Sequence, residues 1–492
     1  MKIIILGAGR IGESVAASLV SEQNDITVID QDGPRLRALE ARFELRGVVG
    51  NGIEPALLEE AGARDTDMLI ACAAQDETNL VACKIAQQMF NIPTRIARVR
   101  SEGYRSHPEL LGREGFGVDR VICPEESLTR YIVRLIDYPE ALQVHEFAGG
   151  LASLISVRAV AGAPLVGCHV DELGVHAPAE GTRIVALYRR QEDGPDRFIP
   201  AAQRSVIEPG DEVFVLAARR NLRTALAALH RRDANTPRTV QRATIAGGGR
   251  VGFRLAQQLH EAFPGLQIKL IERDPERCVV LAAQLPSSVM VLQGDATDEE
   301  LMGDESVGET DFFLALTNDD EDNIMGALLA KRMGARRVLA LINRRSYADL
   351  IHGTQIDIAL TPSQTLLGEL LAFVRRGDVQ VVHSLRRGVA EAMEIVARGD
   401  ARTSRVVGRR VADIKLPKEA HFGLILRGLP DPDAEHGADG EGQDGAEPAE
   451  PEVIVPSAST VIESGDHVVI FMPRKRLVRE VEKLFRVAPT FF

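Results

Sequence analysis

The glycine-rich turn GxGxxG occurs twice in this 492-residue chain, as GAGRIG starting at Gly7 and as GGGRVG starting at Gly247. Each copy follows a short apolar run and precedes a segment whose apolar residues recur at helical spacing. A single copy is weak evidence, because glycines are common and the pattern arises by chance in unrelated turns. Two copies in equivalent contexts predict that the chain contains one folding unit twice.

Residues that match between the two halves keep their order along the chain. Gly247 lies 240 residues after Gly7, and Glu272, at the end of the apolar run KLIE, lies 242 residues after Asp30 in TVID. Later matches have separations between 238 and 244 residues: Gly50 with Gly294, Asn79 with Asn323, Tyr104 with Tyr347, and Pro124 with Pro362. This order indicates a duplication in which insertions are confined to loops.

Within each half, short apolar runs alternate with amphipathic segments. In the first half, helices are expected from Arg10 to about Val20, near Arg35 to Phe43, and from Asn79 to Phe90, between runs such as IIIL, ITVID and DMLIACA. Strands that are apolar throughout, rather than at every second position, are typical of a parallel sheet covered on both faces. The pattern predicts α/β, doubly wound, Rossmann-like domains over about 1–139 and 240–378.

A different pattern follows each of these domains. Residues 142–226 and 380–488 contain isolated strands, a short helix and a closing helix, and both include a Gly-Asp turn before an apolar strand, EPGDEVFVLA and ESGDHVVIFM. Each is predicted to be a small α+β domain. The polar segment 230–241 is expected to link the halves, and the acidic, Gly- and Pro-rich segment 431–452 is expected to be a disordered loop inserted in the last domain.

The composition is that of a soluble globular protein, with 45% hydrophobic and 26% charged residues and no uninterrupted apolar run of membrane-spanning length. The net charge of -13 disfavours a general role on nucleic acid or anionic lipid, because there is no excess of positive charge to hold a polyanion. The five cysteines are too scattered for a metal knuckle or a disulfide framework, and the chain begins with a strand rather than a signal peptide. A cytoplasmic location is therefore expected.

The first glycine turn has the spacing of a dinucleotide-binding site. Gly7 permits the tight turn, Gly9 lets the backbone approach a pyrophosphate, and Gly12 lets the helix lie close to the sheet. Asp30 ends the second strand, where a carboxylate accepts hydrogen bonds from ribose hydroxyls and repels the additional phosphate of NADP. The spacing favours NAD(H) or an adenine mononucleotide over NADP. The alternative is a compact turn beside a solvated acidic residue, with no ligand.

The second half repeats this arrangement with Gly247, Gly249, Gly252 and Glu272. In both halves a loop after the fourth strand is expected to pass over the nucleotide. That loop begins with Ala73 and Ala74 in the first half and with Thr317 and Asn318 in the second.

Two arginines distinguish the halves. Arg98 and Arg100 are two residues apart on a predicted strand, so they share one face and could both reach a phosphate. The equivalent positions hold Leu341 and Asn343, so the two sites are expected to differ. The alternative is that both arginines pair with acidic side chains of the protein.

The residues of a catalytic centre are not evident. A hydride-transfer enzyme needs a general acid or base beside the nicotinamide, and the predicted small domains show no cluster of such residues, since His145, His169, His176 and His383 are scattered. The chain also has no GxGK[ST] loop, no metal-spaced His/Cys set and no nucleophile elbow. We therefore predict no catalytic residues and no metal ligands, and keep an NAD-dependent oxidoreductase as the alternative function.

Longer motifs carry a resemblance to a known family. GAGRIG with VID, RIARVRS, LIDYPEALQV, GGGRVG with LIERD, and LALTNDDEDNIMGALLAKRMGA resemble the TrkA family nearly from end to end. These are tandem RCK (regulator of K⁺ conductance) proteins, the peripheral subunits of bacterial Trk potassium-uptake systems. The resemblance implies two Rossmann-like RCK-N domains, each followed by an RCK-C domain. It also implies a homotetrameric ring at the inner face of the membrane, bound to a membrane-embedded potassium-translocating subunit.

The resemblance further implies that NAD(H) and ATP or ADP bind the RCK-N domains and gate the transporter, without catalysis. Carried over by position, the first site comprises Gly7, Ala8, Gly9, Arg10, Ile11, Asp30, Ala73, Ala74, Arg98 and Arg100. The second comprises Gly247, Gly248, Gly249, Arg250, Val251, Glu272, Thr317 and Asn318. The chain departs from the family pattern in its long acidic segment 431–452 and in Leu341 and Asn343 at the second site.

Overall fold

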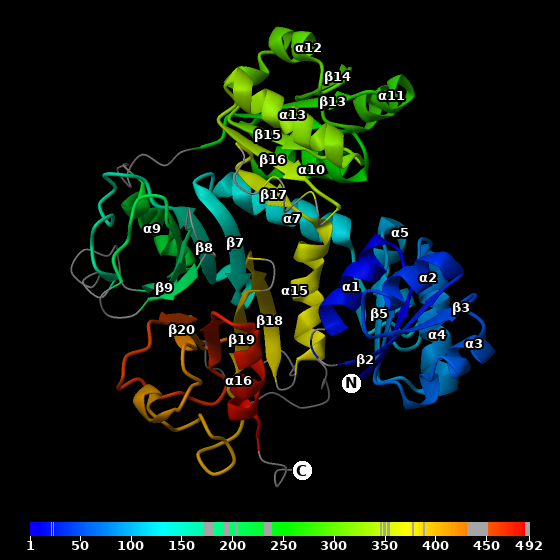
Figure 1. Ribbon diagram of the computed structural model, residues 1–492, viewed down its shortest axis with the longest axis vertical. Helices are drawn as coiled ribbons and strands as arrows, with labels where there is room; N and C mark the ends of the chain where they lie inside the picture. Colours follow the sequence, from blue (N-terminus) through cyan, green and yellow to red (C-terminus); the bar gives the residue numbers. More distant parts are fainter. Residues whose placement is uncertain are drawn as a thin grey trace, which may run out of the picture. The chain divides into compact units, whose positions relative to one another are not determined.

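The protein is described here by a computed structural model that covers residues 1–20, 22, 24–170, 181–190, 197–201, 205–230, 239–344, 347, 351, 355–375, 378–386, 389–430 and 451–487 (Figure 1). The chain forms two compact units. The first contains Met1–Arg130 and Gln241–Leu367, and the second contains Tyr131–Val240 and Gly368–Phe492. Most of the expected linker, all but two residues of the expected acidic loop, and His176 lie outside the described residues.

The first sheet of the first unit is parallel throughout, with strand order β3-β2-β1-β4-β5-β6. Its strands are β1 Lys2–Leu6, β2 Asp25–Asp30, β3 Arg46–Val49, β4 Met68–Ala71, β5 Thr94–Arg98 and β6 Arg120–Ile122. Its helices are α1 Arg10–Val20, α2 Gly33–Glu40, α3 Pro55–Glu60, α4 Asp76–Phe90, α5 Glu102–Arg105 and α6 Pro108–Leu111, and α7 Pro124–Asp137 begins in this unit and ends in the second. The order reverses between β1 and β4, which is where ligands bind in such sheets.

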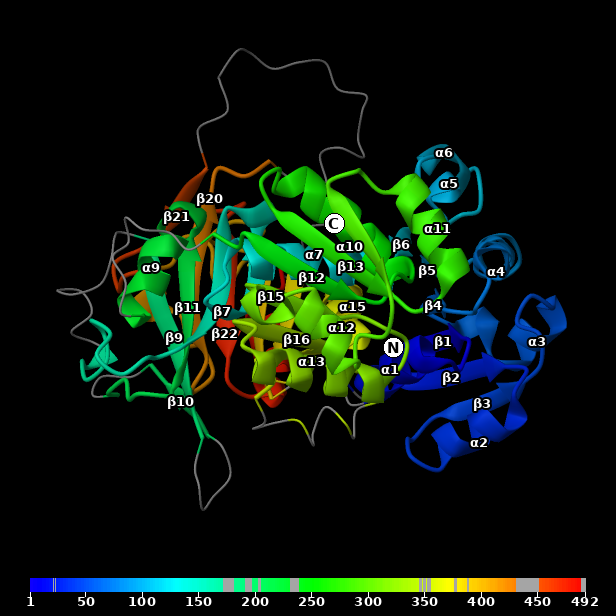
Figure 2. The same ribbon diagram turned by 90° about the horizontal axis from the view of Figure 1, so that it is seen from above.

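The second sheet of this unit has the same topology, with order β14-β13-β12-β15-β16-β17. Its strands are β12 Arg242–Ala246, β13 Gln267–Glu272, β14 Val289–Gln293, β15 Phe312–Ala315, β16 Arg337–Leu341 and β17 Ile358–Leu360. Its helices are α10 Arg250–Ala262, α11 Pro275–Gln284, α12 Glu299–Asp304 and α13 Asp320–Met333, and α15 Pro362–Val374 begins in this unit and ends in the second. In Figure 2, α10 and α11 lie on one side of the strands, and α12 and α13 lie on the other.

The central strands of both sheets are buried along their length. All four residues of β4 and of β15 are buried, as are four of the five residues of β1 and of β12. Helices on both faces exclude water from such strands, which is why they are apolar throughout. The predicted pair of doubly wound α/β domains is confirmed.

Two helices begin earlier than the sequence analysis expected. Helix α2 begins at Gly33 because the side chain of Asp32 accepts a hydrogen bond from the backbone N–H of Arg35, and Pro34 favours the first turn. Helix α4 begins at Asp76 rather than Asn79. The first turn of α4 contains the acidic residues Asp76 and Glu77. A prediction based on the spacing of apolar residues therefore missed this turn.

The second unit contains two five-stranded antiparallel sheets, ordered β10-β9-β11-β8-β7 and β18-β19-β22-β20-β21. The first has β7 Ala141–Phe147, β8 Ala152–Arg158, β9 Thr182–Arg189, β10 Arg197–Pro200, β11 Glu212–Ala218 and helix α9 Leu222–Leu229. The second has β18 Val379–Leu385, β19 Ala390–Val396, β20 His421–Arg427, β21 Glu452–Ile454, β22 His467–Met472 and helix α16 Val478–Phe485. The predicted α+β character of both is confirmed.

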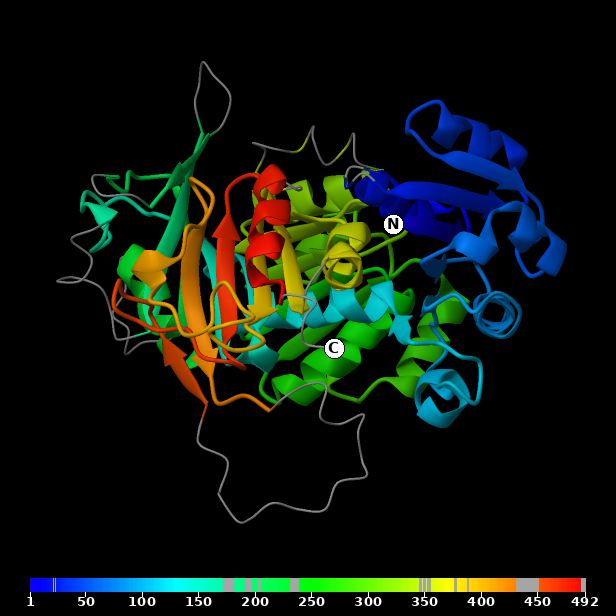
Figure 3. The same ribbon diagram turned by 90° about the horizontal axis from the view of Figure 1, so that it is seen from below.

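These two sheets share one apolar core. Phe147, Phe214 and Leu154 from the first pack with Phe471 and Leu424 from the second, and the two sets of strands lie side by side in Figure 3. Among the described residues, no helix has the length and hydropathy needed to cross a bilayer.

Two equivalent histidines meet inside this second unit. His145 on β7 and His383 on β18 are 238 residues apart, and their ring centroids are 4.7 Å apart. Burial lowers the pKa of His383 to about 4 and holds the pKa of His145 well below its ordinary value. The charged groups that act on the pair are Arg134, which opposes protonation of both rings, and Glu394, which favours protonation of His383.

Stability is therefore expected to fall as the solution is acidified. Because the unfolded chain binds a proton near pH 6.5 while folded His383 does so only near pH 4, stability present above pH 6.5 is lost between these values. The loss attributable to His383 is roughly 3 kcal/mol. Urea denaturation at several pH values, comparing wild type with His383→Phe, measures it. A surface control is His107→Asn, and an equally steep pH dependence in His383→Phe would contradict the prediction.

Candidate functional site

The first glycine turn is tightly constrained by neighbouring backbone. Gly7 has a φ of +99°, in the left-handed region, and its N–H donates to the carbonyl oxygen of Ile29 at 2.8 Å. A Cβ on Gly12 would lie 1.8 Å from the carbonyl oxygen of Gly7. These two glycines are needed to fold the turn, whatever binds there.

Gly9 differs from its neighbours because a Cβ at this position would meet nothing within 4 Å. The residue directly precedes helix α1, and its carbonyl oxygen accepts the first helical hydrogen bond, from Glu13, at 2.8 Å. The turn therefore leaves open space at the helix start, where unpaired N–H groups and the helix dipole favour an anion.

Asp30 ties the turn to the end of β2. Its carboxylate accepts hydrogen bonds from the backbone N–H of Ala8 at 2.6 Å and from that of Asp32 at 2.8 Å. Each carboxylate oxygen retains a further lone pair for a ligand hydroxyl. The sequence placed this carboxylate correctly at the strand end, but its backbone contacts are visible only in the fold.

Two buried polar residues fix the loop after β4. The side chain of Asn79 accepts from the N–H of Ala73 at 2.8 Å and donates to the carbonyl oxygens of Ala73 and Arg98 at 3.2 and 2.8 Å. Asp76 accepts from the N–H groups of Arg100 and Ser101 at 2.9 and 2.7 Å. From the sequence, Asn79 was predicted only to be a repeated position, whereas in the structure its side-chain amide joins the ends of β4 and β5.

The prediction that both arginines lie on one strand is wrong, because β5 ends at Arg98 and Arg100 lies just beyond it. Both arginines have acidic partners, as the alternative interpretation expected. Arg98 Nη2 lies 2.9 Å from Glu125 Oε1, and Arg100 Nε lies 3.5 Å from Asp76 Oδ1. Arg100 also donates to the carbonyl oxygen of Ala74. Yet Arg98 Nε is buried without a hydrogen-bond partner among the described residues, so these pairs do not use all the donors.

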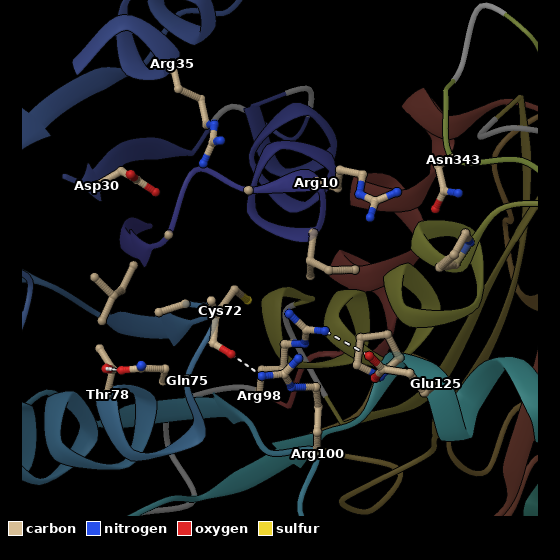
Figure 4. Close-up of a pocket in the computed structure, with 18 of the residues that line it drawn as sticks. Arg10, Asp30, Arg35, Cys72, Gln75, Thr78, Arg98, Arg100, Glu125 and Asn343 are labelled. Atoms are coloured by element: carbon tan, nitrogen blue, oxygen red, sulfur yellow. Dashed lines mark hydrogen bonds and ion pairs between the residues drawn. The ribbon is translucent and has the colours of Figure 1, made fainter. Parts of the chain in front are cut away.

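A pocket of about 710 Å³ opens at this turn, within the range of small-molecule sites. The predicted residues that line it are Gly7, Gly9, Arg10, Ile11, Asp30, Ala73, Ala74, Arg98, Arg100, Val251, Thr317 and Asn318. In Figure 4, Asp30 and Arg35 lie at one end of the pocket, and Arg98, Arg100 and Glu125 lie together at another. The structure thus brings most of the predicted first site to one cavity.

Several lining residues were not predicted from the sequence, and some of them come from segments far along the chain from the first turn. They include Arg35, Gln75, Thr78, Glu125, Leu128 and Asn343. Pro124 was noted as a repeat marker, and it directly precedes Glu125 at the start of α7. That position was the available signal for Glu125. Nothing in the sequence indicated that residues of the second half, such as Asn343, face the first turn.

The second turn reproduces the same hydrogen bonds. Gly247 has a φ of +102°, and Glu272 accepts from the N–H groups of Gly248 at 2.7 Å and Asp274 at 2.9 Å. A Cβ on Gly252 would lie 1.9 Å from the carbonyl oxygen of Gly247. The duplication therefore extends to individual backbone contacts.

Only part of the second turn reaches the same pocket, because Val251 of this turn lines it, together with Thr317 and Asn318. The predicted residues that do not line the pocket are Ala8, Gly247, Gly248, Gly249, Arg250 and Glu272. Arg277 lies across this turn, with its Nε donating to the carbonyl oxygen of Gly248 at 2.8 Å and its guanidinium 5.6 Å from the ring centroid of Phe253. The two turns thus share a backbone but differ in their surroundings.

Cys72 lines the pocket, but its thiol is a poor nucleophile. Burial raises the pKa of Cys72 to about 12, although nearby Arg98 acts in the opposite direction. A thiol with this pKa stays protonated near neutral pH, and the thiolate is the reactive form. The Cys72 side chain is therefore a buried packing residue, directly after the end of β4.

Comparison with known proteins agrees with the duplicated fold. A family model described as the TrkA-N domain matches residues 3–124 and 243–362. Solved structures of the GsuK channel and of the GsuK channel bound to NAD share the fold, with TM-scores of 0.59 and 0.58 and identities of 18% and 19%, and each match covers 98% of this chain and 78% of the other.

Curated relatives match along the whole sequence. The Trk system potassium uptake protein TrkA of Halomonas elongata is 46% identical over 492 residues, covering 100% of both chains. The protein with the same name from Vibrio alginolyticus is 44% identical, again over 100% of both chains. With the duplicated glycine turns and full-length identity at this level, the chain belongs to the TrkA family.

Proposed function

We propose that this protein is the nucleotide-binding regulatory subunit of a Trk-type potassium uptake system. The observation that carries the proposal is the Asp30 carboxylate, fixed beside the first glycine turn at the edge of the pocket. Relatives that match over the full length are named as potassium uptake proteins of the Trk system. Membership of the same family supports a role of this chain in potassium transport. The function is regulation by ligand binding.

The ligand we propose for the pocket is NAD(H). Asp30 would accept hydrogen bonds from the ribose hydroxyls, and the open space at Gly9, together with the first N–H groups of α1, would hold the pyrophosphate. The related fold of the GsuK channel has been solved bound to NAD. Arg98 and Arg100 are the groups that we propose to meet the terminal phosphates when ATP or ADP binds instead.

The second turn is proposed as a weaker nucleotide site. Its Glu272 has the same contacts as Asp30, but Arg277 covers the carbonyl oxygen of Gly248. Gly247, Gly248, Gly249, Arg250, Val251, Thr317 and Asn318 remain the proposed contacts there. Of these, Val251, Thr317 and Asn318 also line the pocket at the first turn. A nucleotide binding this turn would need to displace the Arg277 side chain.

The proposed assembly is a homotetramer at the inner face of the membrane, bound to a membrane-embedded potassium-translocating subunit. The proposed domains of each subunit are 1–139, 142–226, 240–378 and 380–488. A ligand shifts a conformational equilibrium only by binding one state more tightly than another. NAD(H) would supply this difference in binding free energy, and no bond in it would be made or broken.

Calorimetric titration of the purified full-length protein with NADH, NAD, ATP and ADP tests the proposal. Asp30→Ala is expected to weaken NADH binding by about tenfold or more, because the ribose loses charge-assisted hydrogen bonds. The matched control is Glu272→Ala, which removes the equivalent carboxylate of the second turn and should leave the tighter site intact. Circular dichroism verifies that both variants are folded.

Three outcomes are informative against the proposal. Unchanged affinity in Asp30→Ala would remove this residue from the site, and a wild-type protein that binds no nucleotide would contradict the function. Turnover of NADH with a substrate from cell extract would favour an oxidoreductase instead.

Cells that carry Asp30→Ala should also show misregulated potassium uptake, measured as ion flux.

A further inference from the structure

The two sheets of the second unit contact each other through polar side chains as well as through their shared apolar core. We call them the β7 sheet (β10-β9-β11-β8-β7) and the β18 sheet (β18-β19-β22-β20-β21). His383 Nε2 of the β18 sheet lies 2.8 Å from the carbonyl oxygen of Glu146 in the β7 sheet. Because the sheets are duplicates, pairing of a sheet with another copy of itself has to be weighed against the pairing observed.

Arg386 makes the most specific contacts across this surface. It directly follows β18, and its guanidinium forms an ion pair with the carboxylate of Glu212, the first residue of β11. The guanidinium carbon also lies 4.2 Å from the ring centroid of Tyr188 on β9. The side chains of the ion pair are only 19% (Arg386) and 3% (Glu212) exposed. Arg386 therefore contacts a buried carboxylate and an aromatic ring that both belong to the β7 sheet.

The duplicate carries different side chains at the equivalent positions. Ala148 directly follows β7, as Arg386 follows β18, and both residues have a φ in the left-handed region, +47° and +46°. In the β18 sheet, the places of the carboxylate and the aromatic ring are taken by His467, the first residue of β22, and Leu426, the last but one of β20. The two sheets share a backbone here but not a set of contacts.

A second contact crosses the surface in the opposite direction. The backbone N–H of Ala148 donates to Glu394 Oε2 at 2.8 Å, and Glu394 Oε1 lies 2.6 Å from His467 Nδ1. Both of these polar side chains of the β18 sheet are buried. The residue after β7 thus contributes its backbone, whereas the residue after β18 contributes its guanidinium, so the two sides of the surface are not interchangeable.

We infer that Arg386 selects the β7 sheet of the same chain as the partner of the β18 sheet. Two β7 sheets paired through this surface would bury two Glu212 carboxylates beside Ala148, each without the guanidinium that pairs with it here. A buried charge that loses its partner is strongly destabilising. Two β18 sheets would place Arg386 against Leu426 and His467. Only the unlike pair provides the contacts of Arg386, and specificity is such a difference in binding free energy.

This inference goes beyond nucleotide binding and does not depend on it. It also limits how copies of the chain can assemble. The surface around Arg386 is already occupied by the unlike sheet of the same chain, and two β7 sheets are poor partners for each other. Copies of the chain are therefore expected to meet through other surfaces.

Hydrogen exchange of the full-length protein, followed by mass spectrometry, tests the inference. Arg386→Glu and Glu212→Arg each bring like charges together in the buried pair, so protection of the backbone amides in β7 and β18 is expected to fall at least about tenfold. The variant with both substitutions restores opposite charges in exchanged positions. Its protection is expected to return to within about threefold of wild type. Amides of β4, in the first unit, should be unaffected in all three variants.

Arg427 provides a matched control. Its guanidinium pairs with Asp466 at 2.8 Å and with Glu463 at 2.5 Å, both from the segment that leads into β22 of its own sheet. Arg427→Glu also brings like charges together, but adding Glu212→Arg to it should give no recovery of protection. A recovery confined to the Arg386–Glu212 exchange distinguishes recognition of the partner sheet from a general effect of charge.

Wild-type protection of β7 and β18 in Arg386→Glu would overturn the inference, and so would a double variant that is no better protected than Arg386→Glu alone. Equal recovery in the Arg427 control would also overturn it. If Arg386→Glu does not fold, as judged by circular dichroism, Arg386→Gln is compared with the variant that carries both Arg386→Gln and Glu212→Gln. The single variant should lose protection because Glu212 stays buried without its cation. The double variant should recover it, and a failure to recover would contradict the inference.

Discussion

Gly12→Ala is expected to lower the free energy of unfolding by about 3 kcal/mol, whereas Gly9→Ala changes it by less than about 0.5 kcal/mol. A methyl group on Gly12 would lie 1.8 Å from the carbonyl oxygen of Gly7, so α1 would have to move away from β1. A methyl group on Gly9 would contact nothing within 4 Å. Urea denaturation of the two variants measures this difference.

The same pair is expected to behave differently in ligand binding. Gly9→Ala should remain folded but bind NADH at least about tenfold more weakly, because the methyl group occupies space that we assign to the pyrophosphate. Gly249→Ala makes the equivalent change in the second turn, where a Cβ also meets nothing within 4 Å, and serves as the control. Normal NADH binding by Gly9→Ala would show that no phosphate lies over this glycine.

The second large effect concerns a buried ion pair in the second unit. Arg375 Nη2 lies 2.9 and 2.8 Å from the two carboxylate oxygens of Glu391, and the side chains are 3% (Arg375) and 0% (Glu391) exposed. Glu391→Ala is expected to lower the free energy of unfolding by about 3–5 kcal/mol, because it leaves the Arg375 charge buried. Glu482, 4.0 Å from Arg375 Nε, compensates only in part.

Replacing both residues tests whether the loss of stability comes from an unpaired buried charge rather than from the loss of the ion pair itself. The variant with both Arg375→Met and Glu391→Met should lie within about 2 kcal/mol of wild type, since it leaves no buried charge from the pair. The surface control is Arg332→Met, which breaks a pair with Glu299 whose side chains are 64% (Arg332) and 67% (Glu299) exposed, and should cost less than about 1 kcal/mol. Equal losses in Glu391→Ala and Arg332→Met would contradict the prediction.

The duplicated architecture could be predicted from the sequence because its determinants are local and recur. Apolar runs such as β4 and β15 are buried on both sides, so their composition alone indicates a parallel sheet. The roles of Gly7 and Gly12 also follow from the sequence, because a tight strand–turn–helix connection needs glycine where a Cβ would collide with neighbouring backbone. The negative charge of Asp30 and its place at the end of the second strand could also be predicted, because both belong to the local strand–turn–helix–strand pattern.

The tertiary structure decided how the two turns differ. The two similar motifs have different surroundings: Gly7 and Gly9 line a pocket, whereas the carbonyl oxygen of Gly248 in the second turn accepts a hydrogen bond from Arg277. The pairing of Arg98 with Glu125 joins residues from different elements, and so does the approach of Asn343 to the first turn. Spacing along the chain specifies local geometry, but contacts between distant segments depend on how the elements pack, which no single motif records.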